Sequence, residues 1–148
     1  MGLFDQVSGS QTLVKEAFSP AEAFVAITLA VTASDGYLSE EEACLIYSSL
    51  SRMKLFRSYP HDVMNRMLDR LLGILRRQGL DALFNTAKES LPHNLREAAF
   101  AMATDLVLAH GILTQEEKDF LNDLCQALNI SGEVATQIVQ VMLIKHRV

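Results

Sequence analysis

Basic residues, cysteine and tryptophan are scarce in this chain of 148 residues. Lysine and arginine total 13 against 18 aspartate and glutamate residues, so the net charge is −5 and the chain lacks the basic excess that nonspecific nucleic-acid binding needs. No apolar run reaches the ~18–20 residues of a membrane span. The longest run, 98–109, is interrupted by Thr104 and Asp105. We therefore expect neither nucleic-acid binding nor direct membrane insertion.

The two cysteines, Cys44 and Cys125, form no Cys-x-x-Cys pair. We interpret both as small buried apolar groups that are kept reduced, and a redox pair or a metal site built on them is the alternative. The first residues lack the basic start and the long apolar core of a signal peptide. Gln6 stands where a myristoylation site requires serine or threonine. These absences predict a cytoplasmic location.

Catalytic signatures and strand patterns are absent as well. The sequence contains no G-x-S-x-G, P-loop, HExxH or dinucleotide fingerprint, which predicts a protein that is not an enzyme. No alternation of Val, Ile and Thr is long enough for a strand. With 49% hydrophobic residues, the chain can bury a sizeable core. We predict an all-α fold in a single domain, residues 1–148.

Apolar periodicity and boundary residues predict where the helices lie. Ser19 and Pro20 form a strong helix start, and Gly79 ends a later helix. Leu45 and Phe120 are expected to lie within the apolar stripes of their helices. The predicted helices cover residues 20–34, 40–53, 60–78, 80–90, 92–109, 115–128 and 131–147.

One helix–turn–helix phrase occurs twice. Each copy ends an apolar helical run with a glycine that can take the left-handed conformation. Each then restarts with serine or threonine and has a glutamate three positions later, which is the spacing of a capping box. These turn residues are Gly36, Ser39 and Glu42 in the first copy and Gly111, Thr114 and Glu117 in the second.

The repetition extends beyond the turn. Repeat 1 covers about residues 20–78, a linker helix covers about 80–90, and repeat 2 covers about 92–147. We expect two three-helix repeats related by a pseudo-twofold axis in a compact bundle, because an open solenoid generally needs three or more repeats.

Acidic residues gather around the two turns. A pseudo-twofold would bring Asp35 and Glu42 toward Asp105, His110 and Glu117. Asp105 stands alone in an apolar helical run, and a buried carboxylate needs a partner, a metal or solvent. Such a set would suit Ca, Mg, Mn or Zn. The alternative is purely structural, with the glutamates as caps, Asp35 as a turn residue and Asp105 facing water.

The duplicated phrase resembles the tellurite-resistance TerB-like family. The residues that carry the resemblance are 33–42 and their echo 109–117, and with the helix order the likeness covers about residues 20–147. It implies a compact domain of about seven helices with internal pseudo-symmetry. It also implies a stress-response role as a sensor or scaffold, in membrane-linked complexes where the domain is a soluble partner.

The resemblance further implies a divalent metal ion at Asp35, Glu42 and Glu117. His110 departs from the aspartate usual in the family, which puts a second equivalent site in doubt. The alternative function is a protein–protein interaction module or homodimer without metal, contacting its partner through an exposed apolar face of helix 60–78 or 131–147. Four arginines on the helix 60–78 are expected to form a solvated face, with a phosphate or acidic-partner patch as the alternative; they are Arg66, Arg70, Arg76 and Arg77.

Overall fold

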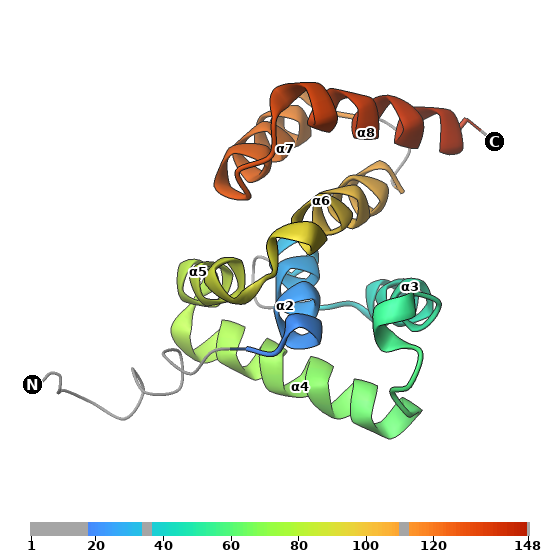
Figure 1. Ribbon diagram of the computed structural model, residues 1–148. Coiled ribbons are helices and arrows are strands. Elements are labelled where there is room, and N and C mark those ends of the chain that lie inside the picture. Colours follow the sequence, from blue (N-terminus) through green and yellow to red (C-terminus); the bar gives the residue numbers. More distant parts are fainter. Residues whose placement is uncertain (1–17, 34–36, 110–112, 148) are drawn as a thin grey trace, which may run out of the picture. The chain divides into compact units, whose positions relative to one another are not determined.

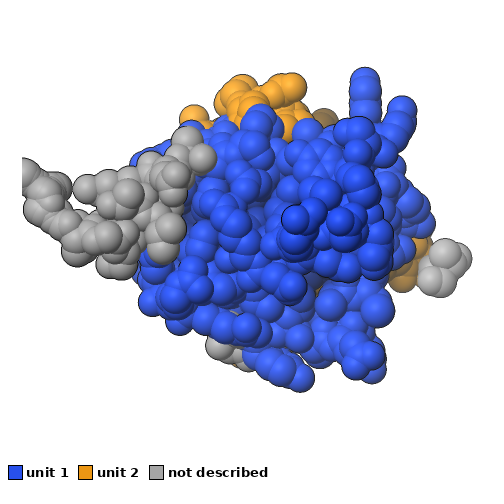
Figure 2. Space-filling model, turned by 90° about the horizontal axis from the view of Figure 1, so that it is seen from below, with its two compact units in different colours: residues 1–91 blue, residues 92–148 orange. Residues whose placement is uncertain are grey.

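The computed structural model describes residues 18–33, 37–109 and 113–147. These residues form seven α-helices and one 3-10 turn and contain no strand, so the all-α prediction is confirmed for them. The chain divides into two compact units, residues 1–91 and 92–148 (Figure 2). None of the described helices combines the length and the apolarity that a membrane span requires. The pseudo-twofold arrangement of two repeats stays a prediction.

The helix boundaries follow the sequence signals to within a few residues. Unit 1 contains α2 (Pro20–Thr32), α3 (Glu40–Ser51), the 3-10 turn η1 (Lys54–Phe56), α4 (His61–Gln78) and α5 (Leu80–Ser90). Unit 2 contains α6 (His93–Leu108), α7 (Gln115–Ala127) and α8 (Gly132–Lys145).

Helix α2 is the centre of unit 1. It packs against α3, α4 and α5 (Figure 1). Small and apolar residues occupy almost every position, and Ala23, Val25 and Ala26 are fully buried. A helix that is apolar on all sides has to be enclosed, and its alanines let neighbouring helices approach closely. The buried Thr28 hydroxyl is satisfied because it donates to the Phe24 carbonyl oxygen at 3.0 Å.

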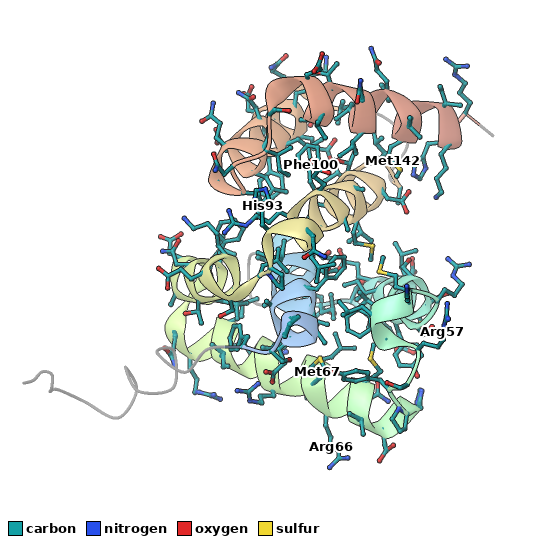
Figure 3. All side chains as sticks on the ribbon, viewed as in Figure 1. Arg57, Arg66, Met67, His93, Phe100 and Met142 are labelled. Atoms are coloured by element: carbon teal, nitrogen blue, oxygen red, sulfur yellow. The ribbon has the colours of Figure 1, made fainter. Side chains whose placement is uncertain are left out.

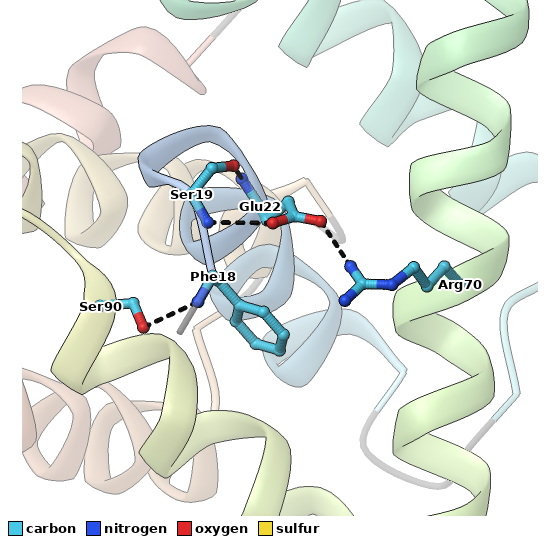
Figure 4. A network of polar contacts seen from close by, with 5 residues as sticks. All are labelled: Phe18, Ser19, Glu22, Arg70 and Ser90. Carbon is cyan, nitrogen blue, oxygen red and sulfur yellow. Dashed lines mark hydrogen bonds and ion pairs between the residues drawn. The ribbon is translucent and has the colours of Figure 1, made fainter. Parts of the chain in front are cut away.

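The start of α2 is fastened to two other helices of unit 1 (Figure 4). Ser19 and Glu22 form a capping box, in which each side chain accepts a hydrogen bond from the other residue's backbone N–H. The Glu22 carboxylate also accepts from the guanidinium of Arg70 on α4. The backbone N–H of Phe18 donates to the Ser90 hydroxyl at the end of α5, at 3.1 Å. Arg70 therefore links α4 to the start of α2 while its side chain stays partly exposed.

Gly79 joins α4 directly to α5. Its φ of 93° lies in the region that side chains other than glycine rarely adopt. Its N–H donates to the Leu75 carbonyl oxygen at 2.9 Å, which closes the last turn of α4. The predicted helix end at Gly79 is confirmed.

In unit 2, α6 packs against both α7 and α8. Phe100 points from α6 toward these two helices, and Met142 lies between α8 and α6 (Figure 3). The buried Thr104 hydroxyl donates to the Phe100 carbonyl oxygen at 2.9 Å, so this polar side chain is satisfied within its own helix. The core of unit 2 lies along α6.

Three sequence predictions about burial are wrong. Cys44 is exposed, whereas Cys125 is buried as predicted. Leu45 and Phe120 are also exposed. The physical reason is the width of the buried stripe: on α3 only Ile46 and Leu50 are buried. Periodicity identifies which way a helix faces, but packing decides how many neighbouring positions are covered.

Candidate functional site

The glutamates of the two repeated turns act as helix caps. In the first turn, the Ser39 hydroxyl accepts from the Glu42 N–H at 3.1 Å, and Glu42 Oε1 accepts from the Ser39 N–H at 3.0 Å. In the second turn, Thr114 and Glu117 make the same pair of bonds at 3.1 and 3.0 Å. The two predicted capping boxes are therefore confirmed, down to the atoms that form them.

Asp105 has two hydrogen-bond partners, the ammonium group of Lys145 and the imidazole ring of His146. Its Oδ1 accepts from Lys145 Nζ at 2.9 Å and from His146 Nε2 at 2.6 Å. Both partners stand at the C-terminal end of α8, so the contacts join α8 to α6. The Asp105 side chain is 25% exposed. A carboxylate in this position is compensated by hydrogen bonds and opposite charge, as the sequence required.

The environment of Asp105 shifts its pKa. Partial burial acts to raise the pKa of this carboxyl, because burial penalises the charged form. The hydrogen bonds from Lys145 and His146, together with their charges, act in the opposite direction and outweigh burial. The pKa of Asp105 therefore lies below its ordinary value of 3.8. The carboxylate is ionised at neutral pH.

Of the five predicted metal ligands, the structure describes three, and these belong to two different units. Glu42 belongs to unit 1, whereas Asp105 and Glu117 belong to unit 2. Asp35 and His110 lie outside the described residues, as do the turn glycines Gly36 and Gly111. Within the described ranges, no group of three or more His, Cys, Asp or Glu side chains is placed to hold a metal ion. The predicted convergence of all five residues stays a prediction.

The C-terminal half of α8 carries an exposed apolar surface. Val141 is 58% exposed and Ile144 is 56% exposed. Residues three apart lie on the same side of a helix, so these two side chains form one outward-facing patch, which we call the α8 outer patch. Between Glu133 and Lys145 the helix carries no ionisable side chain. The α8 outer patch is therefore a small apolar surface on a stretch of helix without charge.

Sequence reasoning missed Lys145 and His146 as partners of Asp105. A signal was present, because a lone acid in the apolar helix α6 has to find a partner and the end of α8 is basic. What the sequence lacked was the packing of α8 on α6. The exposed apolar face of the last helix was foreseen in general terms, and the structure identifies Val141 and Ile144 as its members.

Comparisons with protein-family models, with curated proteins and with solved structures give no match to this chain.

Proposed function

We propose that this chain is a non-enzymatic helical domain of the TerB-like type, which acts by binding as a scaffold or sensor in a stress response. The duplicated turn phrase supports the type, since both copies form the capping boxes that the phrase requires. The all-helical architecture of the described residues agrees with it. A binding role is supported by the α8 outer patch.

The α8 outer patch is the observation that carries this function. Two β-branched apolar side chains, Val141 and Ile144, are more than half exposed on one side of a helix. A second apolar surface that covers these side chains removes them from water. This burial stabilises the complex by about 1–2 kcal/mol per side chain. A protein partner is the natural cover for such a surface.

The partner that fits the patch is a second copy of this chain. The chain has a net charge of −5, so self-association is disfavoured wherever acidic surfaces meet. The stretch of α8 between Glu133 and Lys145 carries no charge, so two copies meet there without repulsion. A symmetric contact uses the same patch on both copies.

Light scattering over a range of protein concentrations tests this proposal. We expect the wild-type chain to form dimers and the double variant Val141→Asn/Ile144→Asn to remain monomeric, because the variant replaces both apolar side chains of the patch. Leu45→Asn is the matched control, since Leu45 is an exposed apolar residue on α3 of the other unit. A wild-type chain that stays monomeric at every concentration, or a double variant that dimerises equally well, would contradict the proposal.

A divalent metal at the turns is a second candidate activity of the domain. It is favoured by the capping geometry, in which Glu42 and Glu117 each use Oε1 for the backbone bond. The other carboxylate oxygen of each residue could serve a hard cation such as Ca or Mg, or Mn or Zn if His110 contributes.

Calorimetric titration of the chelator-treated protein with Ca, Mg, Mn and Zn tests this second activity. We expect saturable heat with at least one ion and its loss in Asp35→Asn. Glu116→Gln is the control, because Glu116 lies beside Glu117 but outside the capping box. No saturable heat and no thermal shift with any of the four ions would refute metal binding.

A further inference from the structure

A pocket of about 300 Å³ opens between α7 and α8 in unit 2. Its lining is mostly apolar and comes from all three helices of the unit, including Phe100 from α6. The other apolar lining residues are Leu113, Leu121, Cys125, Ala135 and Val139. This size is at the lower end of the range for small-molecule sites, which are mostly apolar with a few polar groups.

Polar side chains stand on both walls of the pocket. Lys118 and Asn122 come from consecutive turns of α7, and Thr136 and Gln140 come from consecutive turns of α8. Residues four apart share a helix face, so one pair lines the α7 side of the pocket and the other pair lines the α8 side. The pocket therefore offers an apolar lining and a rim that can donate hydrogen bonds.

Among the residues that line the pocket, Lys118 carries the charge, which is positive. Helix α7 carries the acidic residues Glu116, Glu117, Asp119 and Asp123 and a single cation, Lys118. That cation is the residue that lines the pocket, and no acidic residue is among the lining residues. Within the described part of the chain, the Lys118 ammonium makes no ion pair with a carboxylate. The rim therefore offers one cationic group, the Lys118 ammonium, to an anion.

We propose that the pocket between α7 and α8 binds a small molecule with an apolar chain and a single carboxylate, with the chain against the apolar lining and the carboxylate at Lys118. Burial of the chain supplies most of the binding free energy, at about 0.8 kcal/mol per buried CH₂. The ammonium group of Lys118 selects the carboxylate head. This site is distinct from the α8 outer patch and does not depend on the proposed dimer.

The end of the pocket at Gly132 offers a way to block it. A Cβ added at Gly132 meets no atom within 4 Å, and Gly132 is the first residue of α8, without a positive φ. A larger side chain at this lining position therefore meets no clash at its Cβ and causes no strain in the backbone. Thr136 is exposed on the α8 wall and offers a second position.

The test is an NMR titration of the isotope-labelled chain with sodium octanoate, and with octylammonium chloride at the same concentrations. We expect saturable shifts of the amides of the lining residues with octanoate and binding at least about fivefold weaker with octylammonium. Lys118→Gln should weaken octanoate binding about fivefold, whereas the control Lys54→Gln, an exposed lysine in unit 1, should leave it unchanged.

Blocked variants complete the test. Gly132→Leu and Thr136→Trp should each abolish the octanoate shifts. Both variants should keep the helical circular dichroism of the wild type. Two variants are used so that at least one folded, blocked protein is available. Equal affinity for octanoate and octylammonium, octanoate shifts that map to the α8 outer patch, or no saturable shift at the lining residues would overturn the proposal.

Discussion

Asp105 joins two helices of unit 2, α6 and α8, through its carboxylate. Its carboxylate lies in a mostly apolar helix and accepts hydrogen bonds from Lys145 and His146 on another helix of unit 2. Those two bonds explain why an acid is tolerated there, since the hydrogen bonds and the positive charge of Lys145 compensate a partly buried carboxylate. Through these two bonds, Asp105 joins the C-terminal end of α8 to α6.

Replacing this acid should measurably destabilise the protein. We expect Asp105→Asn to lower the free energy of unfolding by about 1 kcal/mol at neutral pH, because the amide keeps an acceptor oxygen but loses the charge. Asp123→Asn is the control, since Asp123 is an exposed acid on α7 of the same unit. Urea denaturation followed by circular dichroism measures both. Equal stability of the two variants would show that the contacts of Asp105 contribute nothing.

The same residue predicts a pH dependence with a definite sign. The pKa of Asp105 in the folded chain is below its ordinary value of 3.8. Its stabilising contribution is therefore fully present above that value and is lost as the pH falls through the lower folded-state pKa. The difference in unfolding free energy between wild type and Asp105→Asn should shrink as the pH is lowered through this acid range. A difference that stays constant or grows toward low pH would contradict the assignment.

At the scale of elements, the same capping box occurs three times in the part of the chain that the structure describes. They open α2, α3 and α7 with the same reciprocal bonds between a hydroxyl residue and the glutamate three positions later. A box satisfies two backbone donors that would otherwise have no partner at a helix start. The hydroxyl residue and the glutamate of the repeated phrase are therefore accounted for by helix initiation.

Removal of the hydroxyl from either turn should have similar costs. We expect Ser39→Ala and Thr114→Ala each to lower the unfolding free energy by about 1 kcal/mol, the usual cost of losing a cap. Ser48→Ala is the control, because Ser48 lies exposed in the interior of α3 and alanine is a better helix former there. The comparison is made by chemical denaturation, and cap variants as stable as the control would be inconsistent with the observed bonds.

The helices could be predicted from the sequence because their boundaries have local causes. Ser19, Gly79 and Ser131 act through nearby backbone groups, so a few neighbouring residues reveal them. Burial could be predicted only in part. Cys44 and Leu45 are exposed because nothing in their own helix determines how far the neighbouring helices extend over it.

The candidate site depended still more on long-range packing. The capping role of Glu42 and Glu117 is local and was predictable. The pairing of Asp105 with Lys145 spans 40 positions and exists only because α8 packs on α6. The pocket between α7 and α8 also has no local signature, since its lining residues come from three helices.

At the scale of the whole molecule, four of the described acidic residues have roles in the fold, whereas the surfaces proposed for binding are mostly apolar. Glu22, Glu42 and Glu117 cap helices, and Asp105 ties two helices together. Val141 and Ile144, by contrast, have no structural role that explains their exposure.

The most direct test is an NMR measurement of the methyl groups of Val141 and Ile144 as the protein concentration is raised. We expect their signals to shift or broaden together, because the α8 outer patch becomes covered by a second copy, while the methyl signals of Leu45 stay in place. Methyl signals of Val141 and Ile144 that do not change at any concentration, or that change no more than those of Leu45, would contradict the central claim.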